Sequence, residues 1–163
     1  MAKPTYLGLL NAIAVGESTA EPYLLAWADT TKDKRLAKTL RFVAMREGEH
    51  GKAFAKRMLE LGFEVRWPDN DRGAQTMALA TSDKTDIAKF RAFKLHKAPG
   101  KTDVFDSMFA DKTIDPATGA LLGRYIAEER DSGHRLAAEY DRLMAKQKSA
   151  KQKSAKQKSA KAA

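Results

Sequence analysis

The chain has 163 residues, the length of one domain or of one domain followed by a tail. Its formal net charge of +9 is uneven, because seven lysines and no acid lie in residues 145–163, which leaves +2 for residues 1–144. The absence of cysteine excludes disulfides, iron–sulfur clusters, thiolate zinc sites and a cysteine nucleophile.

The N-terminal segment loosely resembles a short signal peptide, with Lys3 followed by the apolar residues 6–15. The same residues begin an amphipathic helix that continues past the supposed cleavage site, which favours a cytoplasmic location. No apolar run in the sequence has the length needed to cross a bilayer, so we expect no membrane partner.

Three long helices are predicted from the spacing of apolar residues: about Thr5–Asp29, about Asp33–Leu61 and about Asp115–Met144. Gly62 suits the position just after the second helix, and Pro116 suits the first turn of the last one. The expected fold is therefore all-α.

The region between the second and last long helices has a weaker pattern. Residues 63–80 are predicted to be a connection, residues 82–97 a shorter helix, and residues 104–109 one more short amphipathic segment. We expect residues 1–144 to form an antiparallel four-helix bundle whose penultimate helix is short or broken.

The remaining residues, 145–163, read AKQKSAKQKSAKQKSAKAA, a five-residue repeat. This Lys-rich, low-complexity segment has no apolar residue larger than alanine, which predicts a solvated, disordered tail. Two interpretations stay open: non-specific binding to nucleic acid through the lysines, and a solubilising repeat without a partner. Seven lysines on duplex DNA would give a log–log salt slope of at most about −6.

Acidic side chains fall on the apolar faces of all three long helices, near their midpoints. At about 100° per residue, Glu17 shares a face with apolar residues of the first helix, Glu47 and His50 do so on the second, and Glu129 does so on the last. An unpaired buried carboxylate costs roughly several kcal/mol, and carboxylates at one level repel each other. A metal cation resolves both problems, and oxygen with imidazole ligands suits iron or manganese.

Glu47 and His50 form a Glu-x-x-His motif, which places both side chains on one helix face. With Glu17 and Glu129, the pattern resembles the ferritin-like superfamily, nearest to rubrerythrin-like and other bacterial di-iron carboxylate proteins, over about residues 5–144. The resemblance implies that these four residues bind one or two iron ions, with manganese as an alternative. It also implies an iron-dependent oxidoreductase that acts with dioxygen or peroxide; no catalytic residue is assigned.

The ligand set of that family is incomplete in this chain. Ser132 stands where a second histidine is expected, and no glutamate lies between Glu64 and Glu128 to supply the third helix's ligand. Arg91 or Lys94 would instead provide positive charge in a metal-free ion cluster. The alternative functions are thus a non-catalytic helical bundle with a degenerate site, or a Dps-like protein whose basic tail binds nucleic acid; a homo-oligomer is also left open.

Several nearby polar residues are interpreted as outside the site. Asp131-x-x-His134 repeats the spacing of a ligand pair, but both residues fall on the outer face of the last helix. Asp86 lies off the inner face of its predicted helix. Tyr125 lies on an inner face and has two interpretations: a hydrogen-bond donor to a site carboxylate, or, as we favour, a packing residue with a satisfied hydroxyl.

Overall fold

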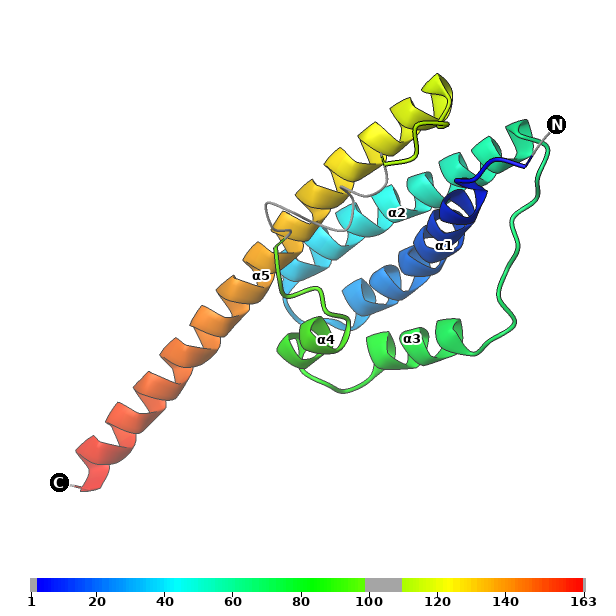
Figure 1. Ribbon diagram of the computed structural model, residues 1–163. Coiled ribbons are helices and arrows are strands. Elements are labelled where there is room, and N and C mark those ends of the chain that lie inside the picture. Colours follow the sequence, from blue (N-terminus) through cyan, green and yellow to red (C-terminus); the bar gives the residue numbers. More distant parts are fainter. Residues whose placement is uncertain (1–2, 99–109, 163) are drawn as a thin grey trace.

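The protein consists of helices joined by short and irregular connections (Figure 1). A computed structural model describes residues 3–98 and 110–162, and no strand occurs in these residues. The all-α prediction is confirmed. The helices are α1 (Leu7–Thr30), α2 (Lys34–Glu60), α3 (Arg72–Thr81), α4 (Asp86–Ala92) and α5 (Pro116–Ala162).

The three long helices lie side by side and alternate in direction, as Figure 1 shows. A short turn joins α1 to α2, so these two helices are antiparallel. The ion pairs at both ends of α2 fix its direction against α5: Arg57 lies 2.8 Å from Asp115, and Asp33 lies 2.7 Å from Arg142. Helix α5 is therefore antiparallel to α2 and parallel to α1.

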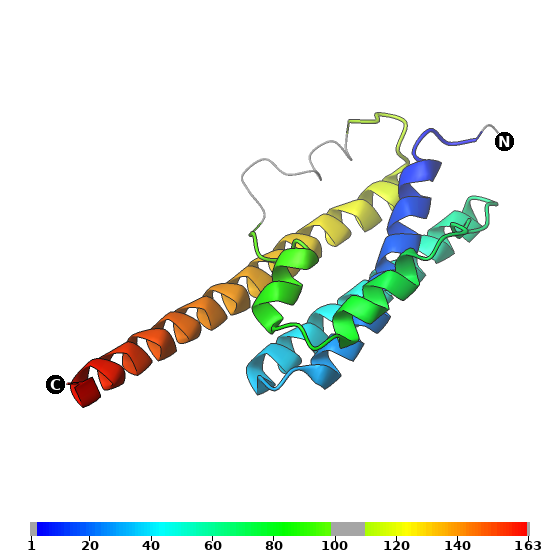
Figure 2. The same ribbon diagram turned by 90° about the horizontal axis from the view of Figure 1, so that it is seen from below.

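Helices α3 and α4 cover only the C-terminal half of α1. Near the end of α1, the Trp27 Nε1–H donates to Asp86 at 2.7 Å, and the Thr30 hydroxyl donates to the Ala80 carbonyl at 3.3 Å. Figure 2 shows the two short helices along this side of the molecule. The predicted helix over 82–97 is thus shorter than expected, and α3 occupies a region predicted to be a connection. The segment predicted over 104–109 lies outside the described residues.

Local signals explain where α2 begins and ends. The Asp33 carboxylate accepts a hydrogen bond from the Leu36 amide at 3.1 Å, which caps the first turn. At the other end Gly62 has φ of 84°, a conformation in which glycine ends helices without strain. No helix in the described part of the chain is both long and apolar enough to span a membrane.

The apolar core is divided into two clusters along the length of the long helices. One cluster lies at the end where α1 meets α2 and includes Leu24, Trp27 and Leu40; the other lies at the opposite end and includes Leu10, Phe54 and Leu122. The middle turns of α1 and α2, together with the part of α5 around Glu129, separate them. The four predicted ligands come from this level.

Helices α1 and α2 approach closely beside this middle level. A Cβ added at Gly51 would lie 2.9 Å from the Ser18 backbone nitrogen, so only glycine fits. Gly48, one turn earlier, lies against the carboxyl end of the Glu21 side chain, which is flexible and able to move, so the constraint there is weaker.

The C-terminal segment differs from its prediction. It was expected to be disordered, but α5 continues through Ala162 and projects beyond the other helices (Figure 1). Alanine, lysine and glutamine have high helix propensity, and extending an existing helix avoids the cost of nucleation. The predicted solvation agrees with the structure, since residues 145–155 are exposed.

Candidate metal centre

The structure brings the four predicted ligands together. Glu17 comes from α1, Glu47 and His50 from α2, and Glu129 from α5, and one ligand atom of each lies within 4.8 Å of the others. Glu47 and His50 are 5% and 3% exposed, so neither is solvated by bulk water. The convergence inferred from helix periodicity is therefore present in the fold.

Glu17 and Glu47 form a carboxyl pair at the centre of the cluster. Burial, a hydrogen bond with Glu17 and the nearby negative charges raise the pKa of Glu47 to about 11. Burial also raises the pKa of Glu17, although its hydrogen bonds with Glu47 and Tyr125 act in the opposite direction. Without a cation, Glu47 therefore holds a proton at neutral pH and shares it with Glu17.

Tyr125 belongs to the site, which agrees with the less favoured of its two interpretations from the sequence. Its hydroxyl donates to Glu17 Oε1 at 2.8 Å. Its ring centroid lies 5.1 Å from that of His50 and 5.2 Å from that of Phe54, with edge-on geometry. Burial and the surrounding carboxylates raise the pKa of Tyr125, so the hydroxyl remains a hydrogen-bond donor at physiological pH.

Glu128 holds the outer side of the His50 ring. The two are joined by a hydrogen bond of 2.6 Å between His50 Nε2 and Glu128 Oε2, and Arg124 donates to the other Glu128 oxygen at 2.9 Å. Burial lowers the pKa of His50, but Glu129 and Glu128 outweigh it and the net pKa is raised. In its neutral form, a histidine whose Nε2–H is bound by a carboxylate presents Nδ1 as its free lone pair.

Two atoms of the cluster are buried without a hydrogen-bond partner, namely His50 Nδ1 and Glu129 Oε1. They lie 3.4 Å apart and belong to two of the four predicted ligands. Buried polar atoms are nearly always satisfied by a protein group, a water or an ion. Three carboxylates and one imidazole are also the donor types that iron and manganese accept, so these residues fit such an ion.

The predicted cationic substitutes lie elsewhere. Arg91 donates to the Tyr140 hydroxyl at 2.9 Å, and Lys94 is exposed. Lys89, which is buried on α4, donates to the Ala80 carbonyl at 2.7 Å. Within residues 3–98 and 110–162, no lysine or arginine forms an ion pair with the three cluster carboxylates.

The second half of a family-type ligand set is absent from the described helices. Ser132 is buried, and its hydroxyl lies 3.3 Å from Arg46 Nη1, which also donates to Asp131 at 2.6 Å. Asp131 therefore binds arginine, in agreement with its exclusion from the site, and His134 is exposed. Asp86 accepts hydrogen bonds from Trp27 and from Thr31, at 2.7 Å each, so α4 contributes no ligand.

A small cavity of about 30 Å³ adjoins His50 and Tyr125 on the side of Arg124. This volume is enough for one water molecule. One water molecule thus fits beside the imidazole of His50.

Comparisons with protein-family models, with curated proteins and with solved structures found no match to this chain. The arguments for function therefore rest on the geometry of the site. Sequence periodicity predicted the four residues of the cluster, but it missed Glu128. The one signal for Glu128 in the sequence was its place directly before Glu129.

Proposed function

We propose that this chain is a metal-binding protein that holds one divalent iron or manganese ion at Glu17, Glu47, His50 and Glu129. The observation that carries the proposal is that His50 Nδ1 and Glu129 Oε1, two buried atoms without a hydrogen bond, face each other at 3.4 Å inside a cluster whose ligand atoms lie within 4.8 Å of one another. A single ion is proposed because the described helices supply only one set of ligands.

The arrangement also supports a ferritin-like ancestry for the scaffold. A glutamate on α1, Glu-x-x-His on α2 and a glutamate on α5 follow the order of the ferritin-like ligands. By this resemblance, a bound iron ion would supply redox chemistry with dioxygen or peroxide. The chain's own part is to orient His50 through Glu128, to hold the Tyr125 hydroxyl on Glu17, and to exclude bulk water.

Metal loading tests the proposal directly. The purified protein is incubated anaerobically with Fe(II), and separately with Mn(II), passed through a desalting column and analysed for bound metal. We expect about one equivalent of at least one of the two metals, and less than about a tenth of an equivalent with both metals would overturn the proposal. Glu47→Gln should abolish loading, whereas Glu49→Gln, on the exposed face of the same helix, should leave it unchanged.

The rival function is a helical bundle without metal, and a specific arrangement supports it. In that state Glu47 keeps its proton against Glu17, and a protonated His50 lies between Glu128 and Glu129. Protons alone would then balance the negative charge of the cluster. Failure of both metals to load, in a protein that remains folded, would favour this rival.

A further inference from the structure

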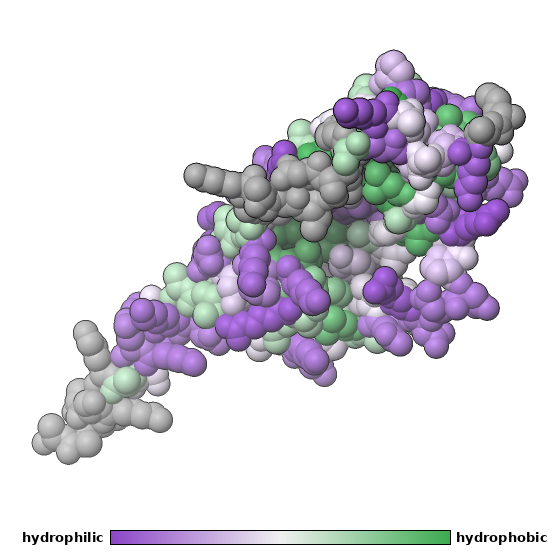
Figure 3. Space-filling view, viewed as in Figure 1, coloured by the Kyte–Doolittle hydropathy of each residue, from purple (hydrophilic) through white to green (hydrophobic). Residues whose placement is uncertain are grey.

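We propose that the projecting part of α5, residues 145–162, is an arm that binds the phosphate backbone of double-stranded DNA. The proposal is independent of the metal centre, which lies at the middle of the bundle. The segment 145–163 contains seven lysines and no acidic residue, and α5 carries it as a helix away from the body. In Figure 3 the described part of this projection is mostly hydrophilic.

The repeat distributes positive charge around the whole helix. Each residue turns the helix by about 100°, so a five-residue step rotates each repeat by about 140° from the one before it. Lysine positions therefore fall on every side of the arm and form no single basic face. The arm is about 27 Å long at about 1.5 Å per residue.

This distribution fits a partner that surrounds the helix with negative charge. The major groove of DNA is about 12 Å wide, admits an α-helix and has phosphates along both of its edges. A membrane-surface helix instead requires a face of bulky apolar residues, and the arm offers only alanine. The arm has no aromatic or arginine residue, so we expect phosphate contacts without base recognition.

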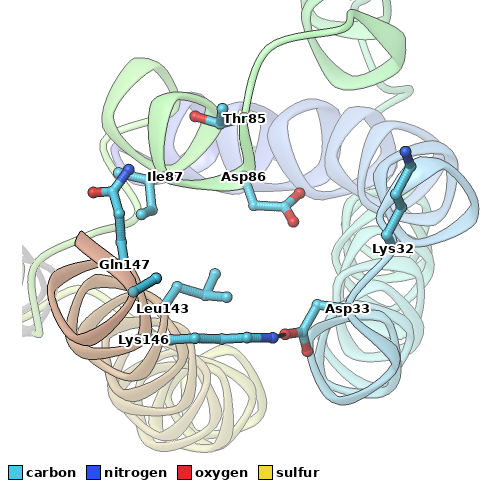
Figure 4. A pocket seen from close by; sticks show the side chains of 9 residues that line it. Lys32, Asp33, Thr85, Asp86, Ile87, Leu143, Lys146 and Gln147 are labelled. Atoms are coloured by element: carbon cyan, nitrogen blue, oxygen red, sulfur yellow. Dashed lines mark ion pairs between the residues drawn. The ribbon is translucent and has the colours of Figure 1, made fainter. Parts of the chain in front are cut away.

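Lysine also lies on the body where the arm begins. Lys32 on the turn between α1 and α2 and Lys146 on α5 line a hollow of about 340 Å³ (Figure 4). The Asp33 carboxylate forms ion pairs with Arg142 at 2.7 Å and with Lys146 at 3.8 Å, so its charge is balanced within the protein (Figure 4). Asp86 accepts hydrogen bonds from Trp27 and Thr31 that fix α4. At the base of the arm, a duplex would thus meet the ammonium group of Lys32, and the other lysines of the arm would supply most of the phosphate contacts.

The test measures binding of the full chain to a fluorescent 25-base-pair duplex by anisotropy, at several salt concentrations. We expect a log–log slope between about −3 and −6, and equal affinity for two unrelated sequences. Replacing all seven tail lysines by glutamine should weaken binding by at least about 100-fold, whereas replacing them by arginine should preserve it. As a control on the body, the double variant Lys52→Gln, Lys56→Gln changes two exposed lysines near the other end of α2.

Three outcomes would overturn the proposal: wild-type affinity in the glutamine variant, a slope shallower than about −2, or binding to phosphatidylserine vesicles in preference to the duplex. Circular dichroism of each variant establishes that the arm is equally helical. Metal loading of the glutamine variant should equal that of the wild type, so failure of this proposal is distinguishable from failure of the metal site.

Discussion

Replacing Glu47 by glutamine should stabilise the metal-free protein at neutral pH. The Glu47 pKa is about 11 in the fold against an ordinary value of 4.5, so the folded protein keeps the proton that the unfolded chain loses. The free energy of unfolding therefore falls as the pH rises from about 4.5 toward 11, as for any acid with a raised pKa. Glutamine resembles the protonated acid in shape and has no proton to lose.

The expected gain follows from the distance between the unfolded pKa and the working pH. Each pH unit above 4.5 lowers the free energy of unfolding of the wild type by about 1.4 kcal/mol. At pH 7 the glutamine variant, which lacks this loss, should therefore be more stable by about 3 kcal/mol. The difference between Glu47→Gln and wild type should shrink to near zero at about pH 4, where Glu47 carries its proton in both the folded and the unfolded wild type.

Urea unfolding in the presence of a chelator, at four pH values from 4 to 8, measures this difference. Glu49→Gln serves as the matched control, because that carboxylate is exposed on the opposite face of α2. A Glu47→Gln variant that is less stable than wild type at pH 7, or whose advantage is the same at every pH, would refute the argument that Glu47 is buried as an acid.

Other substitutions test the helix contact and the orientation of the histidine. Gly51→Ala should lower the free energy of unfolding by about 1–3 kcal/mol, because the added Cβ would lie 2.9 Å from the Ser18 nitrogen; Gly16→Ala, which meets nothing within 4 Å, should instead raise it by up to about 1 kcal/mol. Equal effects in chemical denaturation would contradict the close approach. Glu128→Gln should weaken metal binding by about 10- to 100-fold in titration calorimetry, whereas Glu49→Gln, which alters the other carboxylate beside Arg124, should not. An unchanged affinity for Glu128→Gln would show that the ring of His50 is held by packing alone.

Helical periodicity was sufficient to predict the buried residues of the long helices and the level of the site. Leu10, Leu40 and Leu122 each lie seven residues before a predicted ligand and so share its helix face, and all three are 0% exposed. The same periodicity placed Glu17 and Glu47 at matching heights, because an antiparallel pair joined by a short turn leaves little freedom of register.

Features set by tertiary contacts were not predictable in this way. Helix α3 follows breakers such as Pro68 and has a weak apolar pattern, yet its Ala80 is fully buried against the end of α1. The hydrogen bond that Glu128 accepts from His50 depends on the rotation of α5 against α2, which no single-helix pattern contains. The helical tail was missed because its composition suits a solvated chain and a helix equally well.

The division of the apolar core by a polar level has a consequence for how the molecule opens. Each apolar cluster packs one end of α1 and of α2 against the neighbouring part of α5, so two separate sets of contacts hold the three helices together. An ion held at Glu17, Glu47, His50 and Glu129 would link α1, α2 and α5 at the level between the two apolar clusters. Amide exchange across both halves should then slow together on metal addition, as one cooperative unit in place of two.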